Sequence, residues 1–365
     1  MQIEKVIGLG LMSGSSLDGL DLALCEFSWN TDEHRLEDWQ LLEAQTVPFS
    51  SFWKSKFPHI RTVSAEELVL LDAAFGKYCG EKINAFLQNA ANRPTFIASH
   101  GHTVFHFPEK GVSLQIGNGA HIAAQTIIPT ITSFRDADVA YGGQGAPLAP
   151  KADQLLFSDF DFFLNLGGIA NISHFKGDHI LAYDICGANQ ILNALSNLLG
   201  KPYDEGGEIA ASGKLLPDLL YEVNEIDYFR KEPPKSLDNE WVAINHTQPF
   251  LDAKGSVEDR LHTACINIGQ LIAKAILDAQ LDQSAIKVLV TGGGAYNHFL
   301  LECIQSNWKG KAELILHIPD QEIIEFKEAA LMALLGLLRI NNIPNTLSTV
   351  TGAPKDTIGG ALYLP

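Results

Sequence analysis

Cysteine is scarce in this sequence and follows no motif. The cysteines among the 365 residues are scattered, their number is odd, and no Cys-x-x-Cys pair occurs. Such usage argues against a disulfide framework and is typical of a reduced, intracellular protein. We therefore expect a cytoplasmic protein. The five cysteines are Cys25, Cys79, Cys186, Cys265 and Cys303.

Long hydrophobic runs are also missing. The longest apolar stretch, residues 329–338, is too short to cross a bilayer and predicts a buried helix. The first ten residues contain no basic segment followed by a long apolar run, so no signal peptide is expected. We therefore expect no membrane association.

Positive charge is the third shortage. Lys and Arg number 26 against 43 for Asp and Glu, which gives a formal net charge of −17. An acidic surface repels nucleic-acid backbones and anionic membranes, so neither is an expected partner. ATP is still compatible with this charge, because glycine-rich loops and helix N-termini bind phosphate locally.

Apolar residues, by contrast, are plentiful. The chain is 46% hydrophobic and 19% charged, which is enough apolar material for large cores. The length favours two or three domains. Predicted strands alternate with predicted helices, which indicates an α/β protein. The helices are expected over residues 65–88, 189–199 (with Asn189 as N-cap), 260–279 and 297–308, and the strands over 95–99, 127–131, 180–183, 286–290 and 313–317.

One pattern occurs twice: a strand, a turn of small residues and a second strand. The first copy covers residues 3–27, and the second covers residues 162–175 around Gly167-Gly168. Copies nearly half a chain apart predict two similar lobes, each opening with a hairpin. We expect a boundary near residues 150–160, with domains over residues 1–155 and 156–365.

The first turn, Gly14-Ser15-Ser16-Leu17-Asp18-Gly19, is a candidate phosphate loop. Its backbone N–H groups and hydroxyls can hold phosphate oxygens, and Asp18 could hold Mg²⁺ through water. An ordinary hairpin has the same spacing and is favoured from spacing alone. The preceding Gly8-x-Gly10 resembles a dinucleotide fingerprint, but a strand follows where that motif requires a helix.

A second glycine-rich segment, Gly292-Gly293-Gly294, follows an apolar strand and precedes a helix. Three glycines let a flat ligand such as a nucleoside approach the backbone closely, while a tight strand-to-helix turn explains them equally well. Asp184 follows another strand, where α/β proteins often bind ligands. It could take a proton from water or a sugar hydroxyl, or it could cap a turn.

Two polar clusters complete the candidates. His100, His102 and His106 alternate in a way that would suit a metal, but no carboxylate or cysteine ligands accompany them, so hydrogen-bonding histidines near a cleft are favoured. Arg135 offers a planar fork for a carboxylate or carbonyl, with a salt bridge to a nearby aspartate such as Asp138 as the simpler interpretation.

Taken together and in order, these segments resemble the anhydro-N-acetylmuramic acid kinase family over nearly the whole chain. Each motif is weak alone, and their shared order makes the match specific. The motifs are residues 10–19, 99–104, 114–117, 134–138, 142–148, 165–172, 203–207, 292–297, 327–329 and 350–353.

The resemblance implies the two-lobed hexokinase/actin-like fold, with duplicated ribonuclease H-like domains and ATP in the cleft between the lobes. It implies that the 1,6-anhydro ring of anhydro-N-acetylmuramic acid is opened by water while the γ-phosphoryl group of ATP goes to O6. The product is N-acetylmuramic acid 6-phosphate, an intermediate of peptidoglycan recycling. Mg²⁺ would offset charge on the phosphoryl group.

The resemblance also implies roles for single residues. Asp184 matches the general base that activates water, which suits the inverting logic of glycoside hydrolysis. Phosphate and nucleoside contacts fall on Gly14, Ser15, Ser16, Asp18, Gly19, Gly167, Gly168, Gly292, Gly293, Gly294 and Asn297, and sugar contacts fall on His102, Arg135, Asp138 and Glu328.

The chain departs from the family pattern beside the proposed base. The family usually has Thr-Gly-Pro-Gly-Asn after this aspartate, whereas this chain has Ile185-Cys186-Gly187-Ala188-Asn189. Smaller departures are Ser133, Asn118-Gly119 and Ser15. Two alternatives therefore stay open: a kinase of the same fold for another amino sugar, and a non-catalytic ATP-binding protein. The sequence also leaves the oligomeric state open, a homodimer included.

Overall fold

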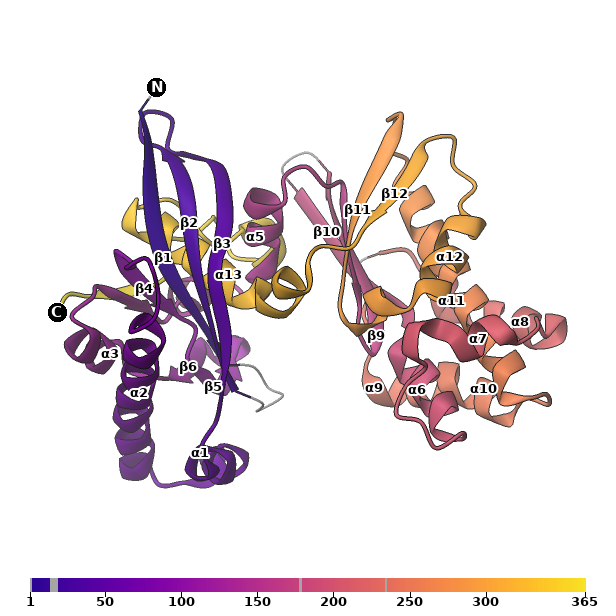
Figure 1. Ribbon diagram of the computed structural model, residues 1–365, viewed down its shortest axis with the longest axis horizontal. Coiled ribbons are helices and arrows are strands. Elements are labelled where there is room, and N and C mark those ends of the chain that lie inside the picture. Colours follow the sequence, from indigo (N-terminus) through magenta and orange to yellow (C-terminus); the bar gives the residue numbers. More distant parts are fainter. Residues whose placement is uncertain (1, 14–18, 177–178, 234) are drawn as a thin grey trace. The chain divides into compact units, whose positions relative to one another are not determined.

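The computed structural model divides into two compact units by its backbone contacts. One unit contains Met1–Phe157 and Gln321–Pro365, and the other contains Ser158–Asp320 (Figure 1). The first crossing lies two residues from the expected boundary at 155/156. Residues 321–365 were expected in the second domain, but they pack with the first unit. The structure describes residues 2–13, 19–176, 179–233 and 235–365.

The first unit is built on a six-stranded sheet in the order β13-β7-β4-β1-β2-β3. Strands β1, β2 and β3 form an antiparallel meander, and β4 and β7 continue the sheet parallel to β1. A separate antiparallel pair, β5 and β6, lies outside this sheet. The elements are β1 Ile3–Ser13, β2 Gly19–Asn30, β3 Arg35–Pro48, α1 Ser51–Lys56, α2 Ala65–Leu87, β4 Phe96–Ser99, β5 His102–Phe107, β6 Val112–Ile116, α3 Gly119–Thr126, β7 Thr130–Thr132, α4 Asp136–Ala140, α5 Ala149–Leu156, α13 Gln321–Ile340, α14 Ser348–Thr351 and β13 Ala361–Tyr363.

The second unit is built on a five-stranded sheet in the order β10-β9-β8-β11-β12. Strands β8, β9 and β10 are an antiparallel meander, and β11 and β12 follow parallel to β8. The elements are β8 Phe162–Leu166, β9 Ile169–Lys176, β10 His179–Gly187, α6 Asn189–Asn197, α7 Glu208–Ser212, α8 Pro217–Asn224, α9 Asn239–Trp241, α10 Gln248–Asp252, α11 Val257–Asp278, β11 Ala285–Thr291, α12 His298–Asn307 and β12 Glu313–His317.

The two sheets repeat one topology. The order β3-β2-β1-β4-β7 in the first unit matches β10-β9-β8-β11-β12 in the second, strand for strand and direction for direction. This is a duplicated ribonuclease H-like domain, so the expected hexokinase/actin-type fold class is confirmed. Both predicted hairpins are confirmed as well, since Ser13 pairs with Leu20 and Leu166 pairs with Ala170.

Helix α13 explains why the C-terminal segment belongs to the first unit. The alternation along β1 turns Leu9 and Leu11 toward one face, where they join a core that includes residues of α2. Gly8 and Gly10 face the other side, and a Cβ on Gly10 would lie 1.8 Å from the carbonyl oxygen of Ala329 in α13. The apolar residues 329–338 are buried in this helix, as the sequence predicts.

Most predicted helices and strands agree with the structure, but the predicted N-cap role of Asn189 is wrong. The expected N-cap is the first residue of α6, and its side-chain amide donates to the carbonyl oxygen of Leu166 at 2.9 Å. Ala188 is the N-cap residue and makes no side-chain cap bond. Tertiary contact with the β8–β9 turn has therefore replaced the local capping bond that composition suggested.

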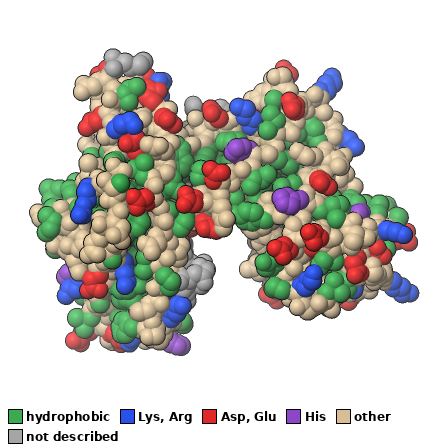
Figure 2. Space-filling model, in the orientation of Figure 1, with side chains coloured by type: hydrophobic (Ala, Val, Ile, Leu, Met, Phe, Trp, Pro, Cys, Tyr) green, Lys and Arg blue, Asp and Glu red, His purple; other side chains and the backbone are tan. Residues whose placement is uncertain are grey.

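The surface is mixed in charge. In the view of Figure 2, basic side chains lie among acidic ones and gather into no patch of their own. None of the described helices is long and apolar enough to cross a membrane. All five cysteines are free and buried.

Replacing Gly10 with alanine tests the contact between β1 and α13. The added Cβ would meet the backbone of Ala329 and Ala333, so the helix must shift, and we expect the free energy of unfolding to fall by about 1–3 kcal/mol. Differential scanning calorimetry measures the change. Gly168→Ala is the matched control, since its Cβ would find its nearest neighbour only at 4.0 Å. An unchanged unfolding temperature for Gly10→Ala would contradict the contact.

Candidate functional site

The first phosphate loop lies mostly outside the described residues. Gly14, Ser15, Ser16 and Asp18 belong to the stretch between β1 and β2 that the structure does not describe, so the proposed magnesium position at Asp18 lies there too. Gly19, the last residue of the motif, begins β2 and is buried. Among the described residues, no group of three or more His, Cys, Asp or Glu side chains could hold a metal ion.

A pocket of about 420 Å³ in the second unit brings several predicted residues together. Three of the residues expected to contact a nucleoside, Gly293, Gly294 and Asn297, line it. Gly292 has a φ of 81° and packs so closely on β8 that a Cβ would lie 2.6 Å from the Asn165 side chain. The remaining lining residues are Asn189, Leu192, Asn193, Tyr203, Asp204, Glu205, Gly206 and Tyr296.

Asp204 also lines this pocket and fixes the turn that follows it. Its two carboxylate oxygens accept the N–H groups of Ile209 and Ala210, each at 2.9 Å. The turn that follows approaches Asn297 so closely that a Cβ on Gly207 would lie 2.2 Å from its side-chain oxygen. That oxygen also caps α12 by accepting the N–H of Leu300 at 2.9 Å, so the Nδ2 group is the part left for a ligand.

The Gly167-Gly168 turn lies beside the same region. The carbonyl of Gly168 accepts the N–H of Ala188 at 2.8 Å, and the carbonyl of Gly167 accepts the N–H of Asn189 at 3.0 Å. These bonds fix the turn against the start of α6. A Cβ on Gly168 would meet almost nothing, so this side of the turn faces open space.

Asp184 lies inside β10 and is neither a turn residue nor a helix cap. It pairs with Asn171 of β9, and a β-bulge separates it from Cys186. Its side chain is half-buried, and Oδ2 accepts the N–H of Leu237 at 2.8 Å. No described residue donates a hydrogen bond to Oδ1. Cys186 is fully buried, and burial raises the pKa of its thiol, which makes it a poor nucleophile.

A second pocket, of about 480 Å³, lies in the first unit. The candidate sugar contacts His102 and Arg135 line it, together with Ser13 at the end of β1. His102 Nδ1 lies 3.0 Å from Ser13 Oγ, and its ring stacks on Phe57 with 4.0 Å between ring centroids. The other lining residues are Met12, Pro58, Ile60, Arg61, His100 and Thr103.

His100 orients Arg135 in this pocket. His100 Nε2 accepts from Arg135 Nε at 3.1 Å and Nη2 at 2.9 Å, while Nδ1 donates to the carbonyl oxygen of Gly101 at 2.9 Å. Burial, and then the Arg135 charge, lowers the pKa of His100 to about 4. The imidazole is therefore neutral at physiological pH, and the hydrogen-bonding interpretation of the histidines agrees with these contacts.

Glu328 lies on α13, next to the residue that contacts Gly10. Its side chain is exposed at the surface. The protein around the carboxyl nevertheless removes part of its hydration, which raises its pKa, and the Asp21 carboxylate raises it further. The charges of Lys327 and Arg135 act in the opposite direction. Glu328 and Arg135 are thus within electrostatic reach of each other in one unit.

Asp138 is fully buried and does not line the pocket. Its oxygens accept the N–H of Gly145 and the hydroxyl of Thr351, both at 2.7 Å. These bonds join the loop that contains Gly145 to the end of α14. The expected alternative, a salt bridge between Arg135 and a neighbouring aspartate, is absent among the described ion pairs, because His100 takes the guanidinium instead.

A model of the anhydro-N-acetylmuramic acid kinase family matches residues 6–365. The chain belongs to this family. A relative named anhydro-N-acetylmuramic acid kinase from Francisella tularensis subsp. novicida is 33% identical over 97% of both chains. Another, from Hydrogenovibrio crunogenus, is 31% identical over 98% of both chains. The chain is thus a sugar kinase.

A solved structure of a ROK family glucokinase from Streptomyces griseus, in complex with glucose and AMPPNP, aligns with 90% of this chain and 98% of that chain. The identity is 11% and the TM-score is 0.37. The fold assignment rests on the strand orders described above.

Sequence reasoning assigned no site role to several residues of this kinase that line the pockets. Phe57, Pro58 and Ile60 belong to a short 3-10 helix without a recognisable motif, so only the tertiary structure brings them to the Arg135 pocket. Asp204 and Gly206 were part of a family motif. Two glycines in the left-handed region beside a buried aspartate are a signal that could have identified this wall of the pocket.

Buried neutral histidines make the fold sensitive to acid. The pKa values of His100, His102 and His246 all fall to about 4, chiefly through burial, so between pH 6.5 and pH 4 the unfolded chain binds protons that the folded chain does not. Stability therefore rises with pH in this window and is lost as pH falls. The loss by pH 4 amounts to about 3 kcal/mol for each histidine.

Urea unfolding at pH 7 and pH 4.5 tests this expectation. His100→Gln should lose less stability on acidification than the wild type does, because one of the three protonation sites is gone. His59→Gln, at an exposed position of the same unit, is the control and should follow the wild type. Equal losses in His100→Gln and the wild type would contradict the argument.

Proposed function

We propose that this kinase opens the 1,6-anhydro ring of anhydro-N-acetylmuramic acid and phosphorylates O6. Water attacks C1, the C1–O6 bond breaks, and Asp184 takes a proton from the water. O6 forms a bond to the γ-phosphorus of ATP as the bond to the β-phosphate oxygen breaks. The products are ADP and N-acetylmuramic acid 6-phosphate, and the sugar phosphate is an intermediate of peptidoglycan recycling.

The geometry of Asp184 is the observation that carries this proposal. One carboxylate oxygen is held by the N–H of Leu237, and no described residue bonds to the other, which leaves it available to a water molecule. A base must lie within hydrogen-bond reach of the proton that it removes, in a fixed orientation. A half-buried carboxylate held on one side meets this requirement.

ATP fits the glycine-rich elements of the second unit. The 420 Å³ pocket has the size and lining expected for a nucleoside, with Gly293 and Gly294 allowing close approach and Asn297 offering its amide group. The Gly167-Gly168 turn beside the N-terminus of α6 suits phosphate oxygens. The loop from Gly14 to Gly19 is the proposed partner of the phosphates in the first unit.

The sugar fits the pocket of the first unit. Arg135 presents a guanidinium whose orientation is fixed by His100, which suits a carboxylate or carbonyl on the substrate. Glu328 and His102 are proposed as neighbouring sugar contacts. Asp138 was expected at the sugar. Because it is fully buried and binds Gly145, whose backbone lies close to Arg135, we assign it the role of positioning Arg135.

Several finer features belong to this proposal. Mg²⁺ bound with ATP would offset negative charge on the phosphoryl group, with Asp18 contacting it through water. We further propose a cytoplasmic enzyme whose partners are ATP and an amino sugar, without nucleic acid or membrane, in a monomer or a homodimer. A kinase for another amino sugar and a non-catalytic ATP-binding protein are the alternatives that the next experiment separates.

Release of ADP tests the reaction and the base together. With ATP, Mg²⁺ and purified anhydro-N-acetylmuramic acid, the wild type should turn over, and Asp184→Asn should lose about 10²- to 10⁴-fold in kcat because the amide cannot accept the proton. Asp282→Asn, an exposed change, is the control. Turnover with a different amino sugar only would favour the first alternative, and ATP binding without turnover on any sugar would favour the second.

Filling the nucleoside pocket tests ATP binding separately. Gly293→Leu places a large side chain at a position where a Cβ meets its nearest atom only at 3.6 Å, so the fold should tolerate it while the pocket fills. We expect ATP and ADP to bind at least about 10-fold more weakly by calorimetry, since the lining glycine is lost. Ser284→Leu, exposed just before β11, is the control. Wild-type affinity in Gly293→Leu would place the nucleoside elsewhere.

A further inference from the structure

The backbone of Asp184 lies on the open edge of a sheet. Strand β10 is the edge strand of the second unit, with β9 on one side only. Outward-facing N–H and C=O groups of an edge strand have no ladder partner, so other parts of the chain or water must satisfy them. Next to a β-bulge this need is greater, because the bulge interrupts the ladder at this residue.

Three residues outside the sheet form hydrogen bonds with the backbone and side chain of Asp184. The N–H of Asp184 donates to the carbonyl oxygen of Lys235 at 3.1 Å, and its carbonyl oxygen accepts the hydroxyl of Tyr228 at 2.8 Å. With the bond from Leu237 N–H to Oδ2, both outward backbone groups and one carboxylate oxygen are held. We name Tyr228, Lys235 and Leu237 the Asp184 clamp.

The hydroxyl of Tyr228 is suited to this role. Burial, and then the Asp184 carboxylate, raises the pKa of the hydroxyl, so it keeps its proton and remains a donor. Its bond goes to the backbone carbonyl of Asp184 and not to the carboxylate. Tyr228 can therefore fix the position of Asp184 without competing for Oδ1, the oxygen that we propose for the water.

Lys235 holds Tyr228 in turn. Its ammonium group lies 4.9 Å from the centre of the Tyr228 ring and 5.9 Å from that of Tyr183, and it is 3.4 Å from the carbonyl oxygen of Tyr228. Cation–π contacts are stronger where water is partly excluded. Burial, and then the nearby Lys274, lowers the pKa of Lys235, which agrees with a partly dehydrated ammonium.

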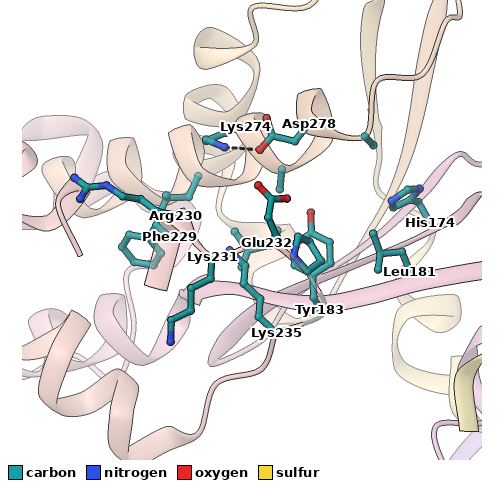
Figure 3. Close-up of a pocket in the computed structure, with 15 residues that line it drawn as sticks. His174, Leu181, Tyr183, Phe229, Arg230, Lys231, Glu232, Lys235, Lys274 and Asp278 are labelled. Carbon is teal, nitrogen blue, oxygen red and sulfur yellow. Dashed lines mark hydrogen bonds and ion pairs between the residues drawn. The ribbon is translucent and has the colours of Figure 1, made fainter. Parts of the chain in front are cut away.

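A cavity of about 250 Å³ borders the clamp on the side of the Lys235 side chain. Figure 3 shows Tyr183, Glu232 and Lys235 gathered around it, with the ion pair between Lys274 and Asp278 at its border. The cavity also separates this part of the clamp from α11. The Lys235 side chain thus has a cavity on this side, and its contacts with the rings of Tyr228 and Tyr183 hold its ammonium group.

From these contacts we infer that Tyr228 and Lys235 are positioning residues for the general base. They act through Asp184: Tyr228 holds its backbone, and Lys235 holds both that backbone and Tyr228. The inference rests on the proposed role of Asp184. A small displacement of a base costs rate much more than it costs substrate binding, because the bound geometry must match the reacting water closely.

Tyr228→Phe isolates one hydrogen bond, because the ring and its contact with Lys235 remain. We expect kcat to fall about 3- to 10-fold, while KM for ATP and for the sugar stays within about twofold. Tyr221→Phe is the matched control, a tyrosine that is 72% exposed in the same unit. Unchanged kcat in Tyr228→Phe, or an equal effect in Tyr221→Phe, would overturn the inference.

A double-mutant cycle separates positioning from general support of the fold. In the Asp184→Asn background, Tyr228→Phe should change the residual kcat by less than about twofold, because the group through which it acts is gone. An undiminished effect there would assign Tyr228 a purely structural role. Wild-type activity of Asp184→Asn alone would instead refute the proposed function, so the two failures are distinguishable.

Lys235 provides the second pair of variants. Lys235→Met keeps the stem and removes the charge, and it should lower kcat as Tyr228→Phe does. Lys235→Arg keeps a cation over both rings and should restore kcat to within about threefold of the wild type. Full activity in Lys235→Met, or equal losses in both variants with an unchanged unfolding temperature, would exclude a positioning role for the Lys235 side chain.

Discussion

The close approach of α13 to β1 is the constraint on which the first unit depends. Gly10 has no Cβ because the backbone of Ala329 occupies that space. Three residues further along β1, Ser13 contacts His102, and one residue before Ala329, Glu328 comes within reach of the Arg135 charge. A single backbone contact thus sets the spacing between a strand whose end lines the proposed sugar pocket and a helix that carries the candidate sugar contact Glu328.

The second unit uses the same kind of contact at the equivalent strand. The end of β8, the counterpart of β1, meets the glycines after β11: a Cβ on Gly294 would lie 2.7 Å from the Cβ of Leu166. Asn189 adds its bond to the carbonyl oxygen of Leu166. In both units glycine is required where another element packs closely on the first strand of the sheet, β1 or β8. The candidate ligand-binding residues lie beside these two contacts.

The pattern of neighbouring residues in the sequence made a large part of the fold predictable. Alternating apolar residues and small-residue turns predict both hairpins, and the register of β8 with β9 agrees with that pattern. Long-range contacts were beyond a single sequence. Nothing local to residues 321–365 says that they return to the first unit, and nothing local to Asp138 says that Thr351 will occupy its carboxylate. The family resemblance supplied residue roles but not burial, so it could not show that Asp138 is fully enclosed.

The unusual segment after Asp184 can now be interpreted from its surroundings. Ile185 and Cys186 are buried, and the N–H of Gly187 donates to His246 Nδ1 at 3.2 Å in the interior. Ala188, also buried, donates to the carbonyl of Gly168. These four residues are therefore buried next to Asp184 in the chain, and Ala188 bonds to the Gly167-Gly168 turn. We expect substitution here to act on the placement of Asp184, the proposed base, whose position its clamp also supports.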